Sequence, residues 1–353
     1  MTLAAAPTAT QLLGIAHPIV LGPFGGGLST VALAATVSNL GGLGSFGAHS
    51  LSADRVADVT AEVRALTNAP FAINLWVSDH DAGGLSLTRA QFDRAFALFE
   101  SWYRELEVHK PDLPERYHPS FALQIEALLA ARPPVFSFVF GIPEVRILAE
   151  CRRLGIVTIG AATSIAEAQA LDAAGVDLIV ATGAEAGGHR PSFLQRAEDS
   201  LIGTFTLVQL IAARVRAPVV AAGGIVDARG VRAVLALGAQ AAQIGTAFLA
   251  CAESGTHDLH REALFSAQAQ HTVLTRSFTG RLARGIRNRW TDELGQPSAT
   301  SPPFPVQSWF VSHLRAPALK AGRSDLISLW SGQIAPNLHH RSAHELMNAL
   351  IED

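Results

Sequence analysis

The chain of 353 residues is 49% hydrophobic and 16% charged, so it can bury a large core, and its formal net charge of -3 gives no strong field for nucleic acid or an anionic membrane. The two cysteines, Cys151 and Cys251, have neither CxxC nor metal-ligand spacing, which argues for a reducing compartment and against a disulfide scaffold. No apolar run reaches membrane-spanning length, and the N-terminus lacks the basic start of a signal peptide. We therefore expect a soluble, cytoplasmic protein that binds neither membrane nor nucleic acid.

Eight short apolar runs recur along the first 250 residues, and most of them are followed by a helix-like segment. The runs lie at 17–22, 43–45, 70–77, 135–140, 156–160, 176–181, 218–222 and 241–245. Strands that alternate with helices predict parallel pairing, and eight such units predict an α/β fold of the closed (β/α)8 TIM barrel type. The alternative is a doubly wound open sheet, but the glycines at 25, 26 and 27 do not complete the early GxGxxG fingerprint.

Two stretches depart from this repeat. Residues 78–134 follow the third strand and contain helix-like pieces at 88–108 and 119–131, which we interpret as a helical insertion or lid. After residue 250 the strand–helix alternation ends. We therefore expect residues 1–250 to form a cofactor-binding barrel with this insertion, and residues 251–353 to form a helical extension that packs on the barrel as a cap.

The loop after the sixth strand combines glycines with three titratable side chains, Glu185, His189 and Arg190. Catalytic residues of such barrels lie at the carboxyl ends of strands, and histidine exchanges protons near neutral pH. We therefore predict that His189 is catalytic and that Gly187 and Gly188 let the backbone approach a bound group. The alternative is a flexible turn with an incidental histidine.

Two glycine-bearing turns follow the seventh and eighth strands, where barrels of this kind commonly bind a phosphate through backbone N–H groups. The first contains Gly223 and Gly224, and the second contains Gly245 and Thr246. The glycines permit close approach, and Thr246 offers a hydroxyl donor. We expect a phosphate site here; the alternative is a pair of tight turns that need glycine for their own geometry.

Five further residues suit a flavin ring, which needs a flat apolar face and hydrogen-bonding groups along one polar edge. We assign the face to Gly22 and Phe24, and the edge to Asn74, Thr182 and Gln243. No histidine pairs with another ligand type at metal-ligand spacing, so no metal site is expected.

Together these segments resemble the nitronate monooxygenase family, formerly called 2-nitropropane dioxygenases. The resemblance spans nearly the whole chain, and its most specific part is Glu-Ala-Gly-Gly-His at 185–189. The other pieces that carry it lie at 18–27, 71–76, 137–143, 222–225, 243–248, 279–284 and 329–333. The resemblance implies a barrel with non-covalent FMN that oxidises alkyl nitronates with O2 to carbonyl compounds and nitrite, without a nicotinamide cofactor.

Carried over by position, the resemblance implies that His189 is the catalytic histidine. It also implies flavin contacts at Asn74, Gly187, Gly224, Gln243, Gly245 and Thr246. Thr182 stands where the family usually has glutamine, and Phe24 where methionine is common.

The leading hypothesis is therefore FMN-dependent oxidation of a small nitronate or nitroalkane by O2, by a monomer or homodimer. One alternative is an NAD(P)H-dependent flavin reductase that acts on enoyl thioesters or quinones. A second alternative, from another functional class, is a protein that holds FMN or another phosphorylated ligand without turnover.

Overall fold

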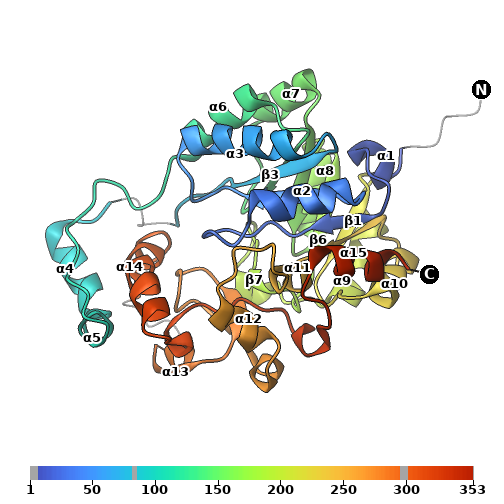
Figure 1. Ribbon diagram of the computed structural model, residues 1–353. Coiled ribbons are helices and arrows are strands. Elements are labelled where there is room, and N and C mark those ends of the chain that lie inside the picture. The colour runs from blue at the N-terminus through green and yellow to red at the C-terminus, as the bar shows by residue number, and fades with distance from the viewer. Residues whose placement is uncertain (1–6, 82–85, 295–300, 353) are drawn as a thin grey trace, which may run out of the picture.

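The computed structural model describes residues 7–81, 86–294 and 301–352, and within them eight parallel strands form a barrel (Figure 1). The barrel strands are β1 (Ile19–Leu21), β2 (Gly44–Gly47), β3 (Phe71–Trp76), β4 (Val135–Val139), β5 (Val157–Ala162), β6 (Leu178–Thr182), β8 (Val219–Ala222) and β9 (Ala241–Ile244). Their order in the sheet is β1-β9-β8-β6-β5-β4-β3-β2. The sheet closes where Val20 pairs in parallel with Leu43, whose N–H donates to the carbonyl of Ile19 at 2.9 Å. The predicted TIM barrel is confirmed.

Helices between consecutive strands cover the outside of the barrel. They are α2 (Val31–Asn39), α3 (Ala53–Leu66), α6 (Phe121–Ala131), α7 (Val145–Leu154), α8 (Ile165–Ala173), α9 (Thr204–Ala212) and α10 (Ala228–Ala236). Thr30, Ser164 and Asp227 begin three of them, because each side chain accepts a hydrogen bond from the backbone N–H three residues later. The buried stripe of α7 includes Ile147 and Cys151, so this cysteine packs in the core.

Inside the barrel, the inward-facing side chains become smaller toward the carboxyl ends of the strands. Ile159 is followed two positions later by Ala161 on β5, and Val220 by Ala222 on β8. At the opposite end, α1 (Ala9–Leu13) packs against this interior cluster. Side chains therefore fill the barrel at the amino ends of its strands and leave space at the carboxyl ends, where a site is expected.

The chain's last helix completes the ring around the barrel. Only a single turn, α11 (Thr246–Leu249), follows β9. The eighth helical position is instead occupied by α15 (Ala343–Ile351), which contacts both α10 and α2 and buries Leu346 and Met347 (Figure 1). Glu253 holds the start of α15 by accepting a hydrogen bond from the N–H of Ala343 at 3.0 Å. Part of the C-terminal stretch thus belongs to the barrel wall itself.

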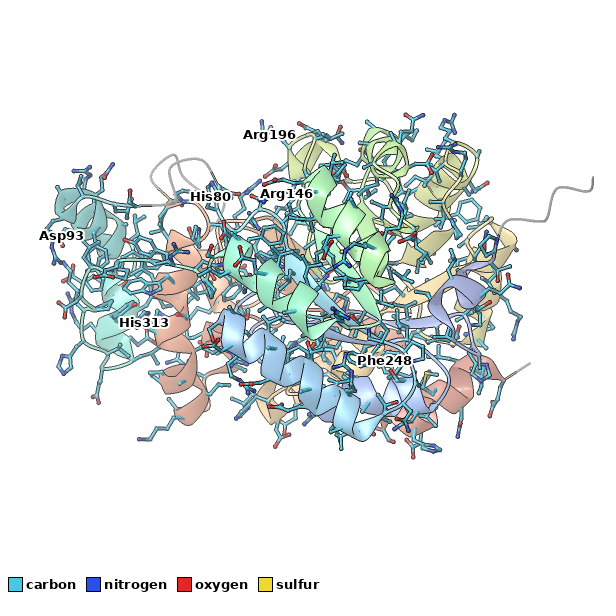
Figure 2. The ribbon with its side chains drawn as sticks, turned by 90° about the horizontal axis from the view of Figure 1, so that it is seen from above. His80, Asp93, Arg146, Arg196, Phe248 and His313 are labelled. Atoms are coloured by element: carbon cyan, nitrogen blue, oxygen red, sulfur yellow. The ribbon has the colours of Figure 1, made fainter. Side chains whose placement is uncertain are left out.

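Only the first half of the insertion after β3 packs away from the barrel. α4 (Arg89–Ala97) and α5 (Glu100–Glu105) pack against α14 (Val306–Lys320), well away from the barrel helices (Figure 1). Phe99 stacks on Phe310 at 5.4 Å between ring centroids, and the Tyr103 hydroxyl donates to the Phe310 carbonyl at 2.7 Å. Figure 2 shows Asp93 of α4 and His313 of α14 on this same side of the molecule. In contrast, α6 lies along α3 as an ordinary barrel helix.

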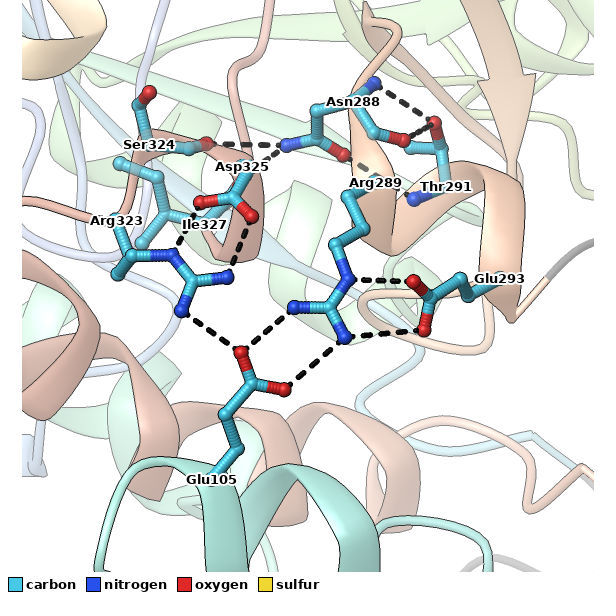
Figure 3. Close-up of polar contacts among 9 residues, drawn as sticks. All are labelled: Glu105, Asn288, Arg289, Thr291, Glu293, Arg323, Ser324, Asp325 and Ile327. Carbon is cyan, nitrogen blue, oxygen red and sulfur yellow. Dashed lines mark hydrogen bonds and ion pairs between the residues drawn. The ribbon is translucent and has the colours of Figure 1, made fainter.

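A group of charged side chains joins α5 to the C-terminal stretch (Figure 3). The Glu105 carboxylate accepts hydrogen bonds from Arg289 at 2.7 Å and from Arg323 at 2.8 Å. Arg289 also pairs with Glu293 on α13 (Arg289–Glu293), and Arg323 pairs with Asp325. The charged groups are partly exposed, so this network adds little stability.

The C-terminal stretch also contributes strands. β10 (Thr272–Thr275) and β11 (Ala283–Ile286) are antiparallel, and β11 pairs in turn with β7 (Gly188–His189), which belongs to the loop after β6. α12 (Asp258–Leu264) and four short 3-10 helices complete the described part of the chain. These helices are η1 (Ala197–Asp199), η2 (Ala267–Gln270), η3 (Ser324–Leu326) and η4 (Ala335–Asn337). No helix in the described ranges is long and apolar enough to cross a membrane.

Candidate functional site

A cavity of about 420 Å³ lies at the carboxyl ends of the barrel strands, between the barrel and the C-terminal stretch. Its size falls within the range of roughly 300–1,000 Å³ that is usual for small-molecule and cofactor sites. All twelve site residues predicted from the sequence line this one cavity. They are Gly22, Phe24, Asn74, Thr182, Gly187, Gly188, His189, Gly223, Gly224, Gln243, Gly245 and Thr246.

The two turns predicted to bind a phosphate contain glycines, and there is open space beside Gly224. Gly223 and Gly224 have φ of +115° and +71°, a region that disfavours residues with a side chain. A Cβ placed on Gly224 would meet only the Cβ of Glu185, at 3.8 Å. At the second turn, the N–H of Gly332 from the C-terminal stretch donates to Thr246 Oγ1 at 2.9 Å. The predicted phosphate site is therefore formed by three chain segments, one of which, residues 329–333, carries the family resemblance but was assigned no role at this site.

Two of the residues assigned to a flavin's polar edge, Thr182 and Gln243, lie on strands β6 and β9, which are separated only by β8. The pairing brings Thr182 beside Ala222 and Ala222 beside Gln243, so these side chains share one level of the barrel. Across the barrel, the amide of Asn74 donates to Ser137 Oγ at 3.0 Å, which orients its side chain. Ser137 is thus a supporting residue that the sequence analysis did not identify.

The residues assigned to the apolar face lie where β1 ends beside β9. The N–H of Gly22 donates to the carbonyl of Ile244 at 2.9 Å, and a Cβ on Gly22 would come within 3.1 Å of Gly245 Cα. The Phe24 ring lies 3.8 Å from the position of a Cβ on Gly245. Glycine at position 22 therefore allows the close approach of the two loops that bound this wall of the cavity.

Of the three titratable residues in the loop after β6, two hold the loop itself. The buried guanidinium of Arg190 donates to the carbonyls of Thr182 and Gly183, at 2.9 and 2.6 Å. Glu185 accepts hydrogen bonds from the backbone N–H and the hydroxyl of Thr204, each at 2.9 Å, at the start of α9. The Glu185 carboxylate and the Arg190 guanidinium therefore stabilise the loop, and the third titratable residue, His189, faces the cavity.

His189 is the titratable residue of this loop that lines the cavity. Its Nε2 lies 2.9 Å from Thr279 Oγ1, and its ring meets Trp76 and Trp330 at 5.1 and 5.2 Å between centroids. Burial, and to a lesser degree the charge of Arg281, lowers the pKa of His189 to about 3. The imidazole is therefore neutral at physiological pH and has a free lone pair, but burial makes it a weaker base than an exposed histidine.

The C-terminal stretch holds the backbone of His189 in place through strand pairing. Ala283 of β11 pairs with His189, and the N–H of Arg190 donates to the Leu282 carbonyl at 2.9 Å. Thr279 belongs to the turn that precedes β11. The segment 279–284 carries the family resemblance, but it was assigned no role from the sequence. Its place beside a histidine 90 residues away could not be read from spacing alone.

Aromatic side chains form the wall next to His189. Trp76 meets Phe140 at 4.7 Å and Phe304 at 5.2 Å between ring centroids. The buried guanidinium of Arg281 lies 4.1 Å from the centroids of both phenylalanine rings and is paired with Asp81 at 3.2 Å. The Arg281 contacts tie the start of the insertion to the turn that follows Thr279.

Two further histidines lie on this wall. His49 stacks on Trp76 at 3.8 Å with the rings nearly parallel, and His118 stacks on His49 at 5.8 Å. Burial, followed by the charge of His118, lowers the pKa of His49 well below its usual value. These two residues come from separate loops, and the sequence analysis had no signal to place them at the site. Among the described residues, no group of three or more His, Cys, Asp or Glu side chains could hold a metal ion.

Comparison with known proteins agrees with this architecture. The nitronate monooxygenase family matches residues 6–353. The probable nitronate monooxygenase of Staphylococcus aureus (strain Newman) is 38% identical over 343 residues, which is 97% of this chain and 95% of the relative. That of Staphylococcus haemolyticus (strain JCSC1435) is 37% identical over 345 residues, with the same coverage.

Two solved structures extend the similarity to the fold. The nitroalkane oxidase from Streptomyces ansochromogenes superimposes with a TM-score of 0.85 at 35% identity, covering 97% of this chain and 96% of the other. FabK from Thermotoga maritima superimposes with a TM-score of 0.74 at 26% identity, covering 98% and 96%. The match to the family extends over almost the whole chain and includes the loops that line the cavity. This chain therefore belongs to the nitronate monooxygenase family of flavin-dependent oxidoreductases.

Proposed function

We propose that this protein binds FMN in the cavity and oxidises alkyl nitronates with O2 to carbonyl compounds and nitrite. The observation that carries this proposal is a neutral, half-buried histidine, His189, on the wall of a cavity that is also lined by glycine-rich turns. The family membership and the likeness to a nitroalkane oxidase support the same reaction class.

The fit of FMN is supported by the space and donors in the cavity. The open position of Gly224 and the turn at Gly245 and Thr246 leave backbone accessible to a phosphate. Gln243, beside this turn, and Asn74, on the opposite side of the barrel, offer amide groups for the polar edge of an isoalloxazine ring. When bound, the flavin supplies the redox and O2 chemistry, which amino-acid side chains lack.

In this proposal His189 removes the acidic proton next to the nitro group of a neutral nitroalkane, or hydrogen-bonds a nitronate that arrives already deprotonated. Trp76, Phe140 and Phe304 next to it exclude water and form an apolar surface for the alkyl chain. This surface favours small, uncharged alkyl groups at the reacting carbon, since a charged group there would lose its hydration.

The test is an absorbance spectrum of the purified protein, followed by anaerobic addition of an alkyl nitronate and, separately, of NADH or NADPH. We expect a flavin spectrum that bleaches with the nitronate, persists with either nicotinamide, and recovers when O2 is admitted with release of nitrite. Rapid bleaching by NADH or NADPH would instead favour the reductase for enoyl thioesters or quinones. A retained flavin that no nitronate bleaches would favour a binding protein without turnover.

A further inference from the structure

Thr279 is the hydrogen-bond partner of His189, and it sits in a turn that the structure holds firmly. The N–H of Gly280 donates to the Arg276 carbonyl at 2.8 Å and closes the turn, in which Gly280 has φ of +84°. Arg276 returns a hydrogen bond to the Gly280 carbonyl at 2.8 Å and pairs with Glu198. The Thr279 hydroxyl is therefore a fixed neighbour of the imidazole rather than a mobile one.

The Thr279 hydroxyl has one hydrogen and two acceptors within reach, the Arg281 carbonyl and His189 Nε2. Thr279 Oγ1 accepts from the backbone N–H of Arg281 at 3.3 Å and lies 3.2 Å from the Arg281 carbonyl, which can only accept. A hydroxyl has a single hydrogen, so donation to that carbonyl leaves the oxygen as an acceptor toward His189. The Nε2 atom of His189, 2.9 Å away, must then carry the ring's proton.

The other ring nitrogen is the one available to a ligand. Among the residues that the structure describes, His189 Nδ1 has no hydrogen-bond partner, and it is not among the unpartnered polar atoms sealed from solvent. Since His189 lines the cavity, this accessible nitrogen is open to it. A neutral histidine with a proton on Nε2 presents a lone pair at Nδ1.

We propose that Thr279 is a positioning residue that holds His189 in the Nε2–H tautomer, so that Nδ1 is the atom that accepts the substrate's proton. This inference rests on the proposed role of His189 as a base and goes beyond it by naming the reacting atom and the residue that selects it. With the opposite tautomer, an N–H would face the substrate, and the residue could bind a nitro group but could not deprotonate the adjacent carbon.

The test compares Thr279→Val, which keeps the shape but loses the hydroxyl, with Thr279→Ser, which keeps the hydroxyl. Thr60→Val is the matched control, because Thr60 also loses a buried hydroxyl, one that donates to the Val56 carbonyl at 2.8 Å outside the cavity. The first readout is ¹⁵N NMR of histidine-labelled protein, with the His189 signals assigned by their loss in His189→Asn. We expect Nε2–H in the wild type, in Thr279→Ser and in Thr60→Val, and a mixture of tautomers in Thr279→Val.

The second readout is turnover of a neutral nitroalkane and of its preformed nitronate. The two tautomers exchange rapidly, so kcat on the neutral nitroalkane should fall in proportion to the fraction of the Nε2–H form that remains, by about twofold for an even mixture. Turnover of the nitronate should change far less, and Thr279→Ser should restore both rates.

Two outcomes would overturn the proposal: a wild-type His189 with its proton on Nδ1, or equal losses on both substrates in Thr279→Val that serine does not restore. The NMR readout does not depend on turnover. If the wild type oxidises no nitronate, the proposed function fails, whereas the spectra still decide whether Thr279 selects the tautomer.

Discussion

The loops after β8 and β9 and the loop after β6 face the same cavity, but they are held in different ways. The first pair depends mainly on local backbone geometry, with positive φ at Gly223 and Gly224 and a helical turn that begins at Thr246, to which Gly332 adds one distant hydrogen bond. The loop after β6 depends on distant contacts, because β11 pairs with His189 and Thr279 binds its ring from 90 residues later in the chain. Retention of the cofactor and the rate of proton transfer should therefore be separable by mutation.

The largest effect is expected from Gly224→Asp, which tests the local half of this comparison. The carboxylate would add negative charge where a phosphate is proposed to bind, so we expect the purified variant to contain almost no flavin, measured by visible absorbance. Gly155→Asp is the matched control, since Gly155 has φ of +72° in open space beyond α7 and Gly224 has φ of +71°. Both variants should lose stability, by about 1–2 kcal/mol from the left-handed conformation, but only the first should lose flavin. Full flavin occupancy in Gly224→Asp would refute the phosphate assignment.

The next effect concerns His189 itself. His189→Asn should keep the fold and the flavin, since the residue lies on a loop and the predicted phosphate site is formed elsewhere. Turnover of a neutral nitroalkane should fall by about a hundred- to ten-thousand-fold, and turnover of the preformed nitronate should fall less because its proton is already gone. Steady-state rates on the two substrates measure this difference. Equal losses would mean that His189 binds charge without acting as a base, and unchanged rates would remove it from the mechanism.

A smaller, pH-dependent effect concerns the segment that contacts both regions. His260 on α12 lies 2.9 Å, through Nε2, from the Trp330 carbonyl, and burial lowers its pKa to about 4. The unfolded chain takes up this proton near pH 6.5, but the folded protein does so only near pH 4. Stability must therefore fall as the pH drops through this window, by about 1.4 kcal/mol per pH unit for one such group.

Replacing His260 measures its contribution to the pH dependence of the unfolding free energy. His260→Gln should flatten the dependence of the unfolding free energy on pH between 6.5 and 4 by about that slope, as measured by urea unfolding at several pH values. An unchanged slope would mean that the folded protein already binds the proton at this site. Because His260 supports the segment that carries Trp330 beside His189 and Gly332 beside Thr246, acid should disturb the loop after β6 and the turn at Thr246 together.

The smallest effect is expected at the charged contacts of α5 shown in Figure 3. Glu105→Gln removes the carboxylate that bridges Arg289 and Arg323, but these side chains are partly exposed and screened by salt. We expect a slight fall in the thermal unfolding midpoint that disappears at high salt, with unchanged flavin content and unchanged rates. A large fall in rate would show that the insertion controls the cavity.

The barrel could be predicted from the sequence because its signals are local. Each strand is a short apolar run, and each glycine turn follows directly after one, so the carboxyl-end positions of Gly224, Thr246 and His189 follow from the repeat alone. The insertion was only partly understood, because helical periodicity does not distinguish α6, which packs on α3, from α4 and α5, which pack on α14.

By itself, the sequence determined the alternation of strands and helices, and with it the edge of the barrel at which the site lies, since both follow from patterns within a few residues. Three further features became visible in the folded protein: α15 completes the ring of helices, β11 pairs with the backbone of His189, and His49 stacks on Trp76. These contacts join segments far apart in the chain, and the energy that selects them comes from burial and backbone pairing between surfaces that exist only once the barrel has formed.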